Sequence, residues 1–186
     1  MIYALLDKEA LDKRGLSLKN LSQKIESLNI PIAQYRNKSG SIEEKKEDLR
    51  IIKKEFSGKL IINDTIALID ECDGLHIGQE DIREFSDDLK ESISKIRAII
   101  GTKTLGLSTH TYEEIIQANE LDIDYIGLGA YRGTVTKTDA RVLGEKALKL
   151  ATYSTHPVGL IGGVKLSDKF ETQISYSVIG SDLYED

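Results

Sequence analysis

The chain has 186 residues, and its 25 Lys and Arg against 31 Asp and Glu give a formal net charge of −6. This length suits a single domain with a substantial core, which we expect to span residues 1–186. One cysteine, Cys72, excludes an internal disulfide framework and a cysteine-based zinc site. With no apolar run of 18 residues and a charged start, we expect a cytoplasmic protein with no membrane partner. The acidic balance argues against nucleic acid and leaves room for a small anionic ligand held by local basic residues.

Short β-branched runs alternate with longer amphipathic, charged segments along the chain. In order, the runs that predict strands are residues 2–7, 31–36, 60–64, 74–78, 104–109, 125–129, 158–162 and 174–180. The segments that predict helices are residues 18–28, 42–56, a short one at 66–71, 89–100, 112–121, 143–153 and a short one near Lys169. Runs such as 60–62 and 158–161 are apolar throughout, which is typical of parallel strands buried on both faces.

This alternation predicts an α/β fold with right-handed βαβ units and a wholly parallel sheet. Eight strand–helix units favour a closed, compact (β/α)8 TIM barrel. The alternative is an open doubly wound sheet, but its usual glycine-rich first turn is missing at residues 7–10. Few residues follow the eighth predicted strand, so we expect the last helix to be truncated or absent. An apolar face left uncovered in this way would favour a homodimer.

In a TIM barrel, the reactive groups come from the carboxyl ends of the strands. Gln34, Arg36 and Lys38 alternate at the end of the second predicted strand and therefore point to one side. One amide and two cations suit an oxyanion such as diphosphate. The competing interpretation is a solvated strand end without a ligand.

Asp64 and Asp81 follow two neighbouring predicted strands, and strands in a sheet lie roughly 5 Å apart. Two carboxylates at such a distance can share Mg²⁺, which proteins commonly hold through one or two carboxylates plus substrate phosphates. Asn63 and Gln79 add amide groups beside them. The competing interpretation makes each aspartate the N-cap of the helix that follows.

The last three strand ends carry hydroxyls, a lysine and glycines. Thr134, Thr136 and Lys137 lie after the sixth strand, where they form either part of a site or an ordinary polar loop. Gly162-Gly163 and Gly180-Ser181 follow the seventh and eighth predicted strands. In many barrel enzymes, the backbone of the loops at these two places binds a phosphate group. Tight strand-to-helix turns use glycine as well.

The three histidines give weaker signals. We expect His76 to pack in or under the barrel, His110 to orient a site group, cap a helix or pack, and His156 to lie in a surface loop. A Ser-His-Asp hydrolase is not supported, because no G-x-S-x-G turn is present.

Seven segments at strand ends carry a further signal: QYRNK (34–38), IIND (61–64), GLHIGQED (74–81), GLSTHT (106–111), DYIGLGAYRGTVTKTD (124–139), GLIGGV (159–164) and YSVIGS (176–181). Together and in this order, they resemble the superfamily of thiamine phosphate synthases and thiazole tautomerases, and the synthases most closely. The resemblance runs over nearly the whole chain.

The resemblance implies a transferase, a thiamine-phosphate diphosphorylase, that joins hydroxymethylpyrimidine diphosphate to thiazole phosphate and releases diphosphate with Mg²⁺ as cofactor. It also assigns roles: Gln34, Arg36, Lys38 and Asn63 would hold the pyrimidine diphosphate, Asp64 and Asp81 the Mg²⁺, Ser108 and Lys137 the diphosphate, and Thr134, Thr136, Gly163, Ile179 and Gly180 the thiazole phosphate. Of these, Arg36, Ser108 and Lys137 are the expected catalytic residues.

Two alternatives remain at this point. One is a thiazole tautomerase of the same superfamily. Such an enzyme would lack some of the residues that bind diphosphate and metal, and it would have a histidine at the position of Ala130. A barrel that binds thiazole or thiamine phosphates without catalysis would fit the unusual segment 129–134, which reads GAYRGT instead of a GPxFPT-like sequence. In that segment Arg132 adds a cation, which we expect to converge with Arg36, Lys38 and Lys137 on one rim.

Overall fold

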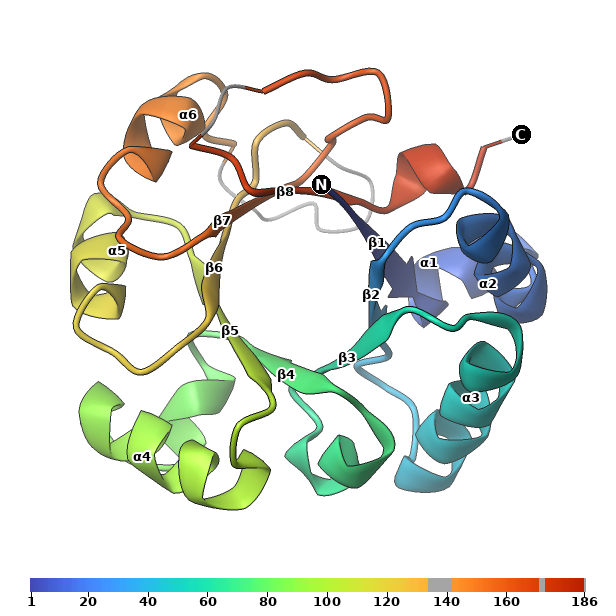
Figure 1. The fold of residues 1–186 in the computed structure, drawn as a ribbon, viewed down its shortest axis with the longest axis horizontal. Coiled ribbons are helices and arrows are strands. Elements are labelled where there is room, and N and C mark those ends of the chain that lie inside the picture. The colour runs from blue at the N-terminus through green and yellow to red at the C-terminus, as the bar shows by residue number, and fades with distance from the viewer. Residues whose placement is uncertain (134–141, 171–172, 186) are drawn as a thin grey trace.

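The computed structural model describes residues 1–133, 142–170 and 173–185. Eight parallel strands pair in chain order, and β1 pairs with β8, so the sheet closes into a barrel (Figure 1). The strands are β1 (Ile2–Asp7), β2 (Ile32–Arg36), β3 (Lys59–Asn63), β4 (Gly74–Ile77), β5 (Thr104–Thr109), β6 (Tyr125–Leu128), β7 (Val158–Ile161) and β8 (Tyr176–Ile179). The TIM barrel is confirmed, and the open sheet is wrong.

The helices form an outer ring around the barrel (Figure 1). They are α1 (Lys8–Lys13), α2 (Leu18–Ser27), α3 (Ile42–Glu55), α4 (Leu89–Ile100), α5 (Tyr112–Ala118) and α6 (Lys146–Ala151), with single-turn or short 3-10 helices η1 (Ile66–Glu71), η2 (Asp81–Glu84) and η3 (Ser181–Leu183). Side chains of Ser17, Ser41, Asp88 and Thr111 cap four of the α-helices by accepting an N–H three residues on. Ser41 and Glu44 form a reciprocal capping box.

Helix α1 was not expected from the sequence. It starts directly at the end of β1, where Asp7 is both the last strand residue and the N-cap, accepting from the Ala10 N–H at 2.9 Å. Six residues are too few to show a helical period, and no turn residues separate α1 from the strand.

Two separate apolar clusters form the core. The larger one lies between the barrel and its outer ring, and the smaller one fills the barrel with Tyr3, Ile32, Ile61, Tyr125 and Val178. Because side chains alternate along a strand, the odd-numbered positions of β1 and the even-numbered ones of β2 point inward.

Glycines on the facing strands make room for the large inward side chains. A Cβ on Gly106 would lie 2.2 Å from the Tyr125 ring carbon Cζ, and one on Gly127 would lie 2.9 Å from His76 Cε1. The interior therefore combines branched aliphatic residues with large aromatic and polar side chains that pack against the bare backbone of glycines.

The short helix expected near Lys169 is not present in the described residues 165–170, which form a turn and irregular chain. The physical reason is the side chain of Asp168, which accepts the Lys165 N–H at 2.9 Å and closes a tight turn. After β8 the described residues form the single turn η3, as expected for a last helix that is short or absent in this sequence.

The outer faces of β7 and β8 are nevertheless covered. Leu160 and Ile179 are fully buried, and they belong to the same apolar cluster as Val164, Leu183 and Tyr184. The uncovered face that favoured a homodimer is therefore absent, and the homodimer stays a prediction without that argument. No helix in the described residues is long and apolar enough to cross a membrane.

Candidate active site

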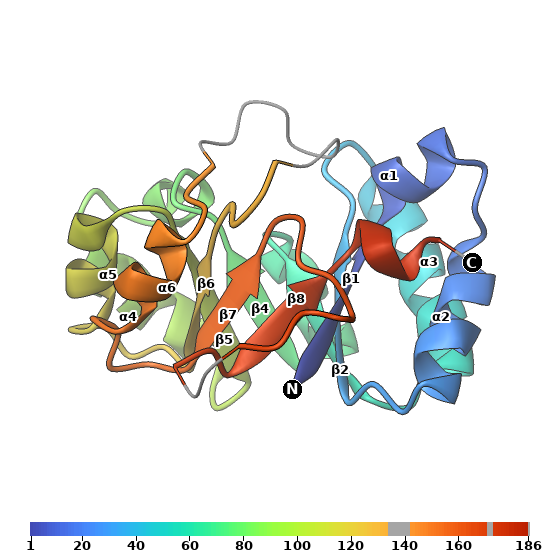
Figure 2. The ribbon, with the colours of Figure 1, turned by 90° about the horizontal axis from the view of Figure 1, so that it is seen from above.

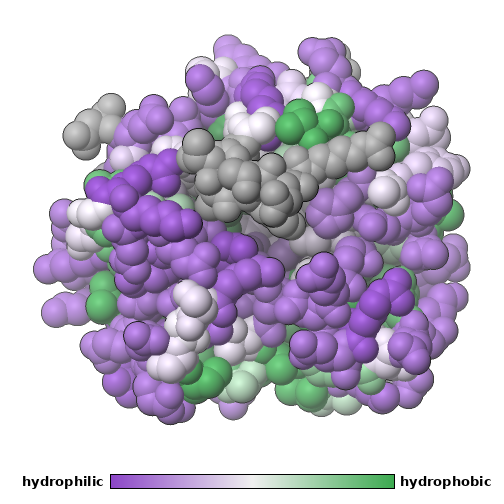
Figure 3. Space-filling model, turned by 180° about the vertical axis from the view of Figure 1, so that it is seen from behind, coloured by the Kyte–Doolittle hydropathy of each residue, from purple (hydrophilic) through white to green (hydrophobic). Residues whose placement is uncertain are grey.

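A cavity of about 190 Å³ opens at the carboxyl ends of the strands, which all point to the same end of the barrel (Figure 2). Since one water molecule takes up roughly 10–15 Å³ of such a cavity, the cavity has room for a small organic molecule. The surface at this end is mostly hydrophilic, with hydrophobic side chains in small separate groups (Figure 3). Nine of the site residues expected from the sequence line the cavity: Gln34, Arg36, Lys38, Asn63, Asp64, Asp81, Ser108, Gly163 and Gly180.

Four expected residues are not brought into this set. Ile179 is absent from the lining and is fully buried in the outer core, so only its backbone is near the site. This follows from strand alternation, because the neighbouring Val178 and Gly180 face the cavity. Thr134, Thr136 and Lys137 lie outside the described residues.

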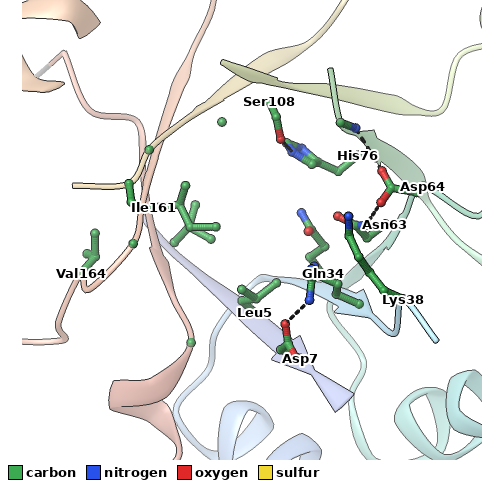
Figure 4. A pocket seen from close by; sticks show the side chains of 18 of the residues that line it. Leu5, Asp7, Gln34, Lys38, Asn63, Asp64, His76, Ser108, Ile161 and Val164 are labelled. Carbon is green, nitrogen blue, oxygen red and sulfur yellow. Dashed lines mark hydrogen bonds and ion pairs between the residues drawn. The ribbon is translucent and has the colours of Figure 1, made fainter. Parts of the chain in front are cut away.

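The cavity has two unlike sides (Figure 4). One, which we call the polar wall, comes from β1 to β5 and the loops after them: Asp7, Gln34, Arg36, Lys38, Asn63, Asp64, His76, Asp81 and Ser108. The other, the glycine wall, comes from β6 to β8 and their loops: Gly127, Gly129, Ala130, Ile161, Gly162, Gly163, Val164, Val178 and Gly180.

In the polar wall, Arg36 is fixed by a partner that the sequence did not point to. Its Nη1 lies 2.5 Å from Oδ2 of Asp7, which is almost fully buried. One of the five guanidinium donors is engaged in this way, and the others stay available to an anion. Gln34 is 4% exposed and Arg36 is partly buried, whereas Lys38 is exposed, so the first two residues of this strand end face the cavity and not bulk solvent. Asp7 is the last residue of β1 and lies on the same inward face as Tyr3 and Leu5. This alternation in the sequence could have predicted that Asp7 faces the cavity.

Asp64 is held by the backbone and by its neighbour. Its φ is 57°, its Oδ1 accepts the Gly78 N–H at 3.0 Å, and the Asn63 amide donates to Oδ2. Burial raises the pKa of Asp64 above its ordinary value, and the nearby charge of Asp81 raises it further, while Lys38 opposes the shift. A bound cation would relieve both effects.

Neither aspartate caps a helix, so the capping interpretation is wrong. The N-cap positions are Thr65 for η1 and Glu80 for η2, and neither helix has a side-chain cap. The carboxylates instead bracket the bare backbone of Gly78, where a Cβ would lie 2.7 Å from Asp81 Oδ2 and 3.8 Å from Asp64 Oδ1.

The donor set fits Mg²⁺. The hard carboxylate oxygens of Asp64 and Asp81 border a space that only glycine leaves open. That composition matches the preference of Mg²⁺ for one or two carboxylates, with water and phosphate oxygens completing its shell.

His76 is buried inside the barrel, as expected, but it also reaches the site. Its Nε2 lies 2.9 Å from Ser108 Oγ, and its Nδ1 lies 2.9 Å from Tyr125 Oη. Burial lowers the pKa of His76 to about 4, so the ring is neutral near pH 7. His76 lies on the inward face of the strand next to β5, and this position could have predicted its contact with Ser108.

In the glycine wall, the loop after β6 crosses the loop after β7. The N–H groups of Tyr131 and Arg132 donate to the carbonyls of Ile161 and Gly162, each at 2.8 Å. A Cβ on Gly163 would lie 2.7 Å from the Arg132 Cβ. The glycines are therefore required by this close approach of two backbones.

Arg132 does not join the rim of cations. Its guanidinium forms a bidentate pair with Asp168 at 2.6 and 3.1 Å and also donates to the Gly163 carbonyl. Because that charge is neutralised outside the cavity lining, the expected convergence of Arg132 with Arg36 and Lys38 is not found.

Fold and site together define a TIM-barrel protein with a cavity at the carboxyl ends of its strands that is lined on one side by charged and polar residues. A family model described as thiamine monophosphate synthase matches residues 2–172. The chain belongs to this family.

Curated relatives agree with the family model. The thiamine-phosphate synthase of Persephonella marina is 32% identical over 195 residues, covering 100% of this chain and 88% of the relative. That of Clostridioides difficile is 38% identical over 174 residues, covering 90% and 78%. Among solved structures, a thiamine phosphate pyrophosphorylase from Pyrococcus furiosus has the same fold, with a TM-score of 0.74 at 21% identity over 97% of this chain and 85% of that one.

Proposed function

We propose that the cavity joins hydroxymethylpyrimidine diphosphate to thiazole phosphate and releases diphosphate. The protein is a thiamine-phosphate synthase, a transferase of thiamine biosynthesis. The observation that carries the site assignment is the polar wall, where two cations, three carboxylates and a serine meet at one side of the cavity. Since both substrates are phosphorylated and do not cross membranes unaided, we place the reaction in the cytoplasm.

The polar wall suits the departing diphosphate. When the bond between the pyrimidine methylene carbon and the diphosphate oxygen breaks, its electrons leave with the diphosphate, and negative charge grows there. Arg36 and Lys38 are placed to stabilise that charge, and the Ser108 hydroxyl can donate to it. Gln34 offers amide groups to the pyrimidine.

Asp64, Asp81 and Asn63 are the residues that would hold Mg²⁺. When bound, the ion supplies positive charge that neutralises the diphosphate oxygens. The bracketed space beside Gly78 supports this assignment.

The glycine wall suits the second substrate. Ile161 and Val164 offer apolar surface to a thiazole ring, and Gly163 and Gly180 offer backbone that a phosphate can approach closely. The thiazole nitrogen then forms a bond to the pyrimidine methylene carbon, so no protein nucleophile is needed. Thr134, Thr136 and Lys137 complete this proposal from outside the described residues.

The test is formation of thiamine phosphate from both substrates, with and without Mg²⁺. We expect product only when Mg²⁺ is present. Isomerisation of the thiazole carboxylate phosphate without coupling would instead make the protein a tautomerase, and tight binding without turnover would make it a non-catalytic binder. Either result would overturn the proposal.

A further inference from the structure

Five polar side chains form a continuous hydrogen-bonded chain beneath the cavity, which we call the relay. Gln34 Nε2 lies 3.1 Å from Tyr3 Oη, which lies 2.9 Å from Tyr125 Oη. Tyr125 Oη lies 2.9 Å from His76 Nδ1, and His76 Nε2 lies 2.9 Å from Ser108 Oγ. The relay thus joins two cavity residues, Gln34 and Ser108, through the interior of the barrel.

The two tyrosines in the middle of the relay are closed to water, and His76 is buried at the border of the cavity. Tyr3 is 1% exposed, Tyr125 3% and His76 7%. Buried hydroxyl and ring hydrogens need acceptors, and the hydrogen-bond partners of these side chains in the structure are the other members of the relay. The glycines that face Tyr125 and His76 leave the space in which these rings meet.

The orientation of the Gln34 amide sets the direction in which the hydrogens point, because in the structure its nitrogen faces Tyr3 Oη. The Gln34 amide nitrogen can only donate, so Tyr3 Oη accepts from it. The Tyr3 hydrogen then goes to Tyr125, since in the opposite direction it would have no acceptor among the described residues. The Tyr125 hydrogen in turn goes to His76 Nδ1.

The consequence falls on the histidine ring. A neutral ring that accepts at Nδ1 carries its hydrogen on Nε2, and it therefore donates to Ser108 Oγ. With its oxygen already accepting from the ring, Ser108 has its own hydrogen free to turn into the cavity.

We propose that the relay of Gln34, Tyr3, Tyr125, His76 and Ser108 fixes Ser108 as a hydrogen-bond donor to the substrate anion, with Tyr3, Tyr125 and His76 as positioning residues. The proposal deepens the proposed function, because it rests on Ser108 facing the departing diphosphate. The Gln34 amide orientation sets the direction of the whole relay. A ligand group that donates to the Gln34 carbonyl at one end would therefore favour Ser108 as a donor at the other.

The first test needs no substrate. In protein labelled with ¹⁵N-histidine, nuclear magnetic resonance distinguishes a ring nitrogen that bears hydrogen from one that accepts. We expect His76 with hydrogen on Nε2 in the wild type, and a loss of that preference in Tyr125→Phe. Hydrogen on Nδ1 in the wild type would overturn the proposal, whatever the protein catalyses.

The second test measures coupling between two positions. Tyr125→Phe should lower kcat about tenfold and Ser108→Ala about 100-fold or more, with little change in KM for the pyrimidine diphosphate, because the hydrogen bond matters most as charge develops. In the Ser108→Ala background, Tyr125→Phe should cause no further loss. Equal losses in both backgrounds would overturn the relay.

Tyr176→Phe is the matched control. The Tyr176 ring packs edge-on against Tyr3 and Tyr125 at centroid distances of 6.0 and 5.7 Å, and no hydrogen bond links its hydroxyl to the described residues. We expect it to keep the wild-type rate. A loss as large as that of Tyr125→Phe would mean that packing, not hydrogen direction, is responsible.

Two further checks keep the outcomes separate. Should Tyr125→Phe fail to fold, Tyr3→Phe interrupts the relay one position earlier and should show the same dependence on Ser108. Should the wild type form no thiamine phosphate, the proposed function fails, while the ¹⁵N measurement still decides the relay.

Discussion

The two walls of the cavity solve different problems with different residues. The polar wall holds its side chains in place by hydrogen bonds: the charged Asp7 with Arg36, the amide of Asn63 with Asp64, and the neutral His76 with Ser108. Among the described residues, the glycine wall places no charged side chain in the cavity lining and depends on two loop backbones in close contact. A charged leaving group needs the first kind of surface, and a ring with a phosphate needs the second.

The outer ring of helices also differs between the two walls. Around β1 to β3, α2 and α3 are long helices with side-chain caps, whereas no helix is described between β7 and β8. The last strands are covered by loop residues and the single turn η3 instead. Each wall is thus supported differently. We expect substitutions in the polar wall to lower the catalytic rate and substitutions in the glycine wall to lower the stability.

The largest effect is expected in the polar wall, from Asp64→Asn. Asparagine keeps the shape and tolerates the positive φ of 57°, but it removes the charge that would hold Mg²⁺. We expect kcat to fall by a factor of about 100 or more, measured against Mg²⁺ concentration.

Asparagine is the better substitution at this position because alanine would strain the left-handed backbone. The control is Asp87→Asn, an exposed carboxylate outside the cavity lining, which should keep its rate. Turnover near the wild-type level in Asp64→Asn would show that the metal assignment is wrong.

The next effect is on stability in the glycine wall, from Gly163→Ala. Gly163 and Gly15 have nearly the same φ, 62° and 64°, but a Cβ at Gly15 would meet nothing within 4 Å. Both substitutions should cost about 1–2 kcal/mol for the left-handed backbone. Gly163→Ala should cost a further 1–3 kcal/mol or so, because the Arg132 Cβ must move.

Thermal unfolding measures this difference. For a chain of this size, roughly 2–4 °C of Tm corresponds to 1 kcal/mol, so Gly163→Ala should unfold several degrees below Gly15→Ala. Equal Tm values for the two variants would mean that the crossing of the loops does not constrain this glycine.

The alternation of strand and helix segments and their lengths predicted most of the fold. These patterns failed where side-chain contacts determine the local structure. The strands were placed within one or two residues, yet α1 was missed because its cap is the last residue of a strand. The helix near Lys169 was wrong because Asp168 closes a turn there.

The site shows the same division. Gln34, Arg36, Asp64 and Asp81 could be found from their places at strand ends. The Asp168 partner of Arg132 lies 36 residues away in the chain, and no local pattern predicts such a pair. The chain of hydroxyls between Gln34 and Ser108 likewise depends on the closed barrel that brings distant strands together.

The smallest effect is expected from Arg132→Gln. The pair with Asp168 is bidentate, but Arg132 is 42% exposed, so its loss should cost about 1 kcal/mol or less. The control is Arg50→Gln, whose single contact with Glu47 at 3.1 Å is exposed on both sides and should contribute almost nothing.

The pH dependence of this difference tests its cause. Arg132 holds the pKa of Asp168 below its ordinary value, so the stabilisation is present above the unfolded value of about 3.9 and is lost as pH falls through the lower folded value. In urea unfolding, the gap between wild type and Arg132→Gln should therefore be constant near pH 7 and close in acid. A gap that persists in acid would mean that Arg132 acts through its hydrogen bond to the Gly163 carbonyl and its packing over the Tyr131 ring, contacts that do not depend on the charge of Asp168.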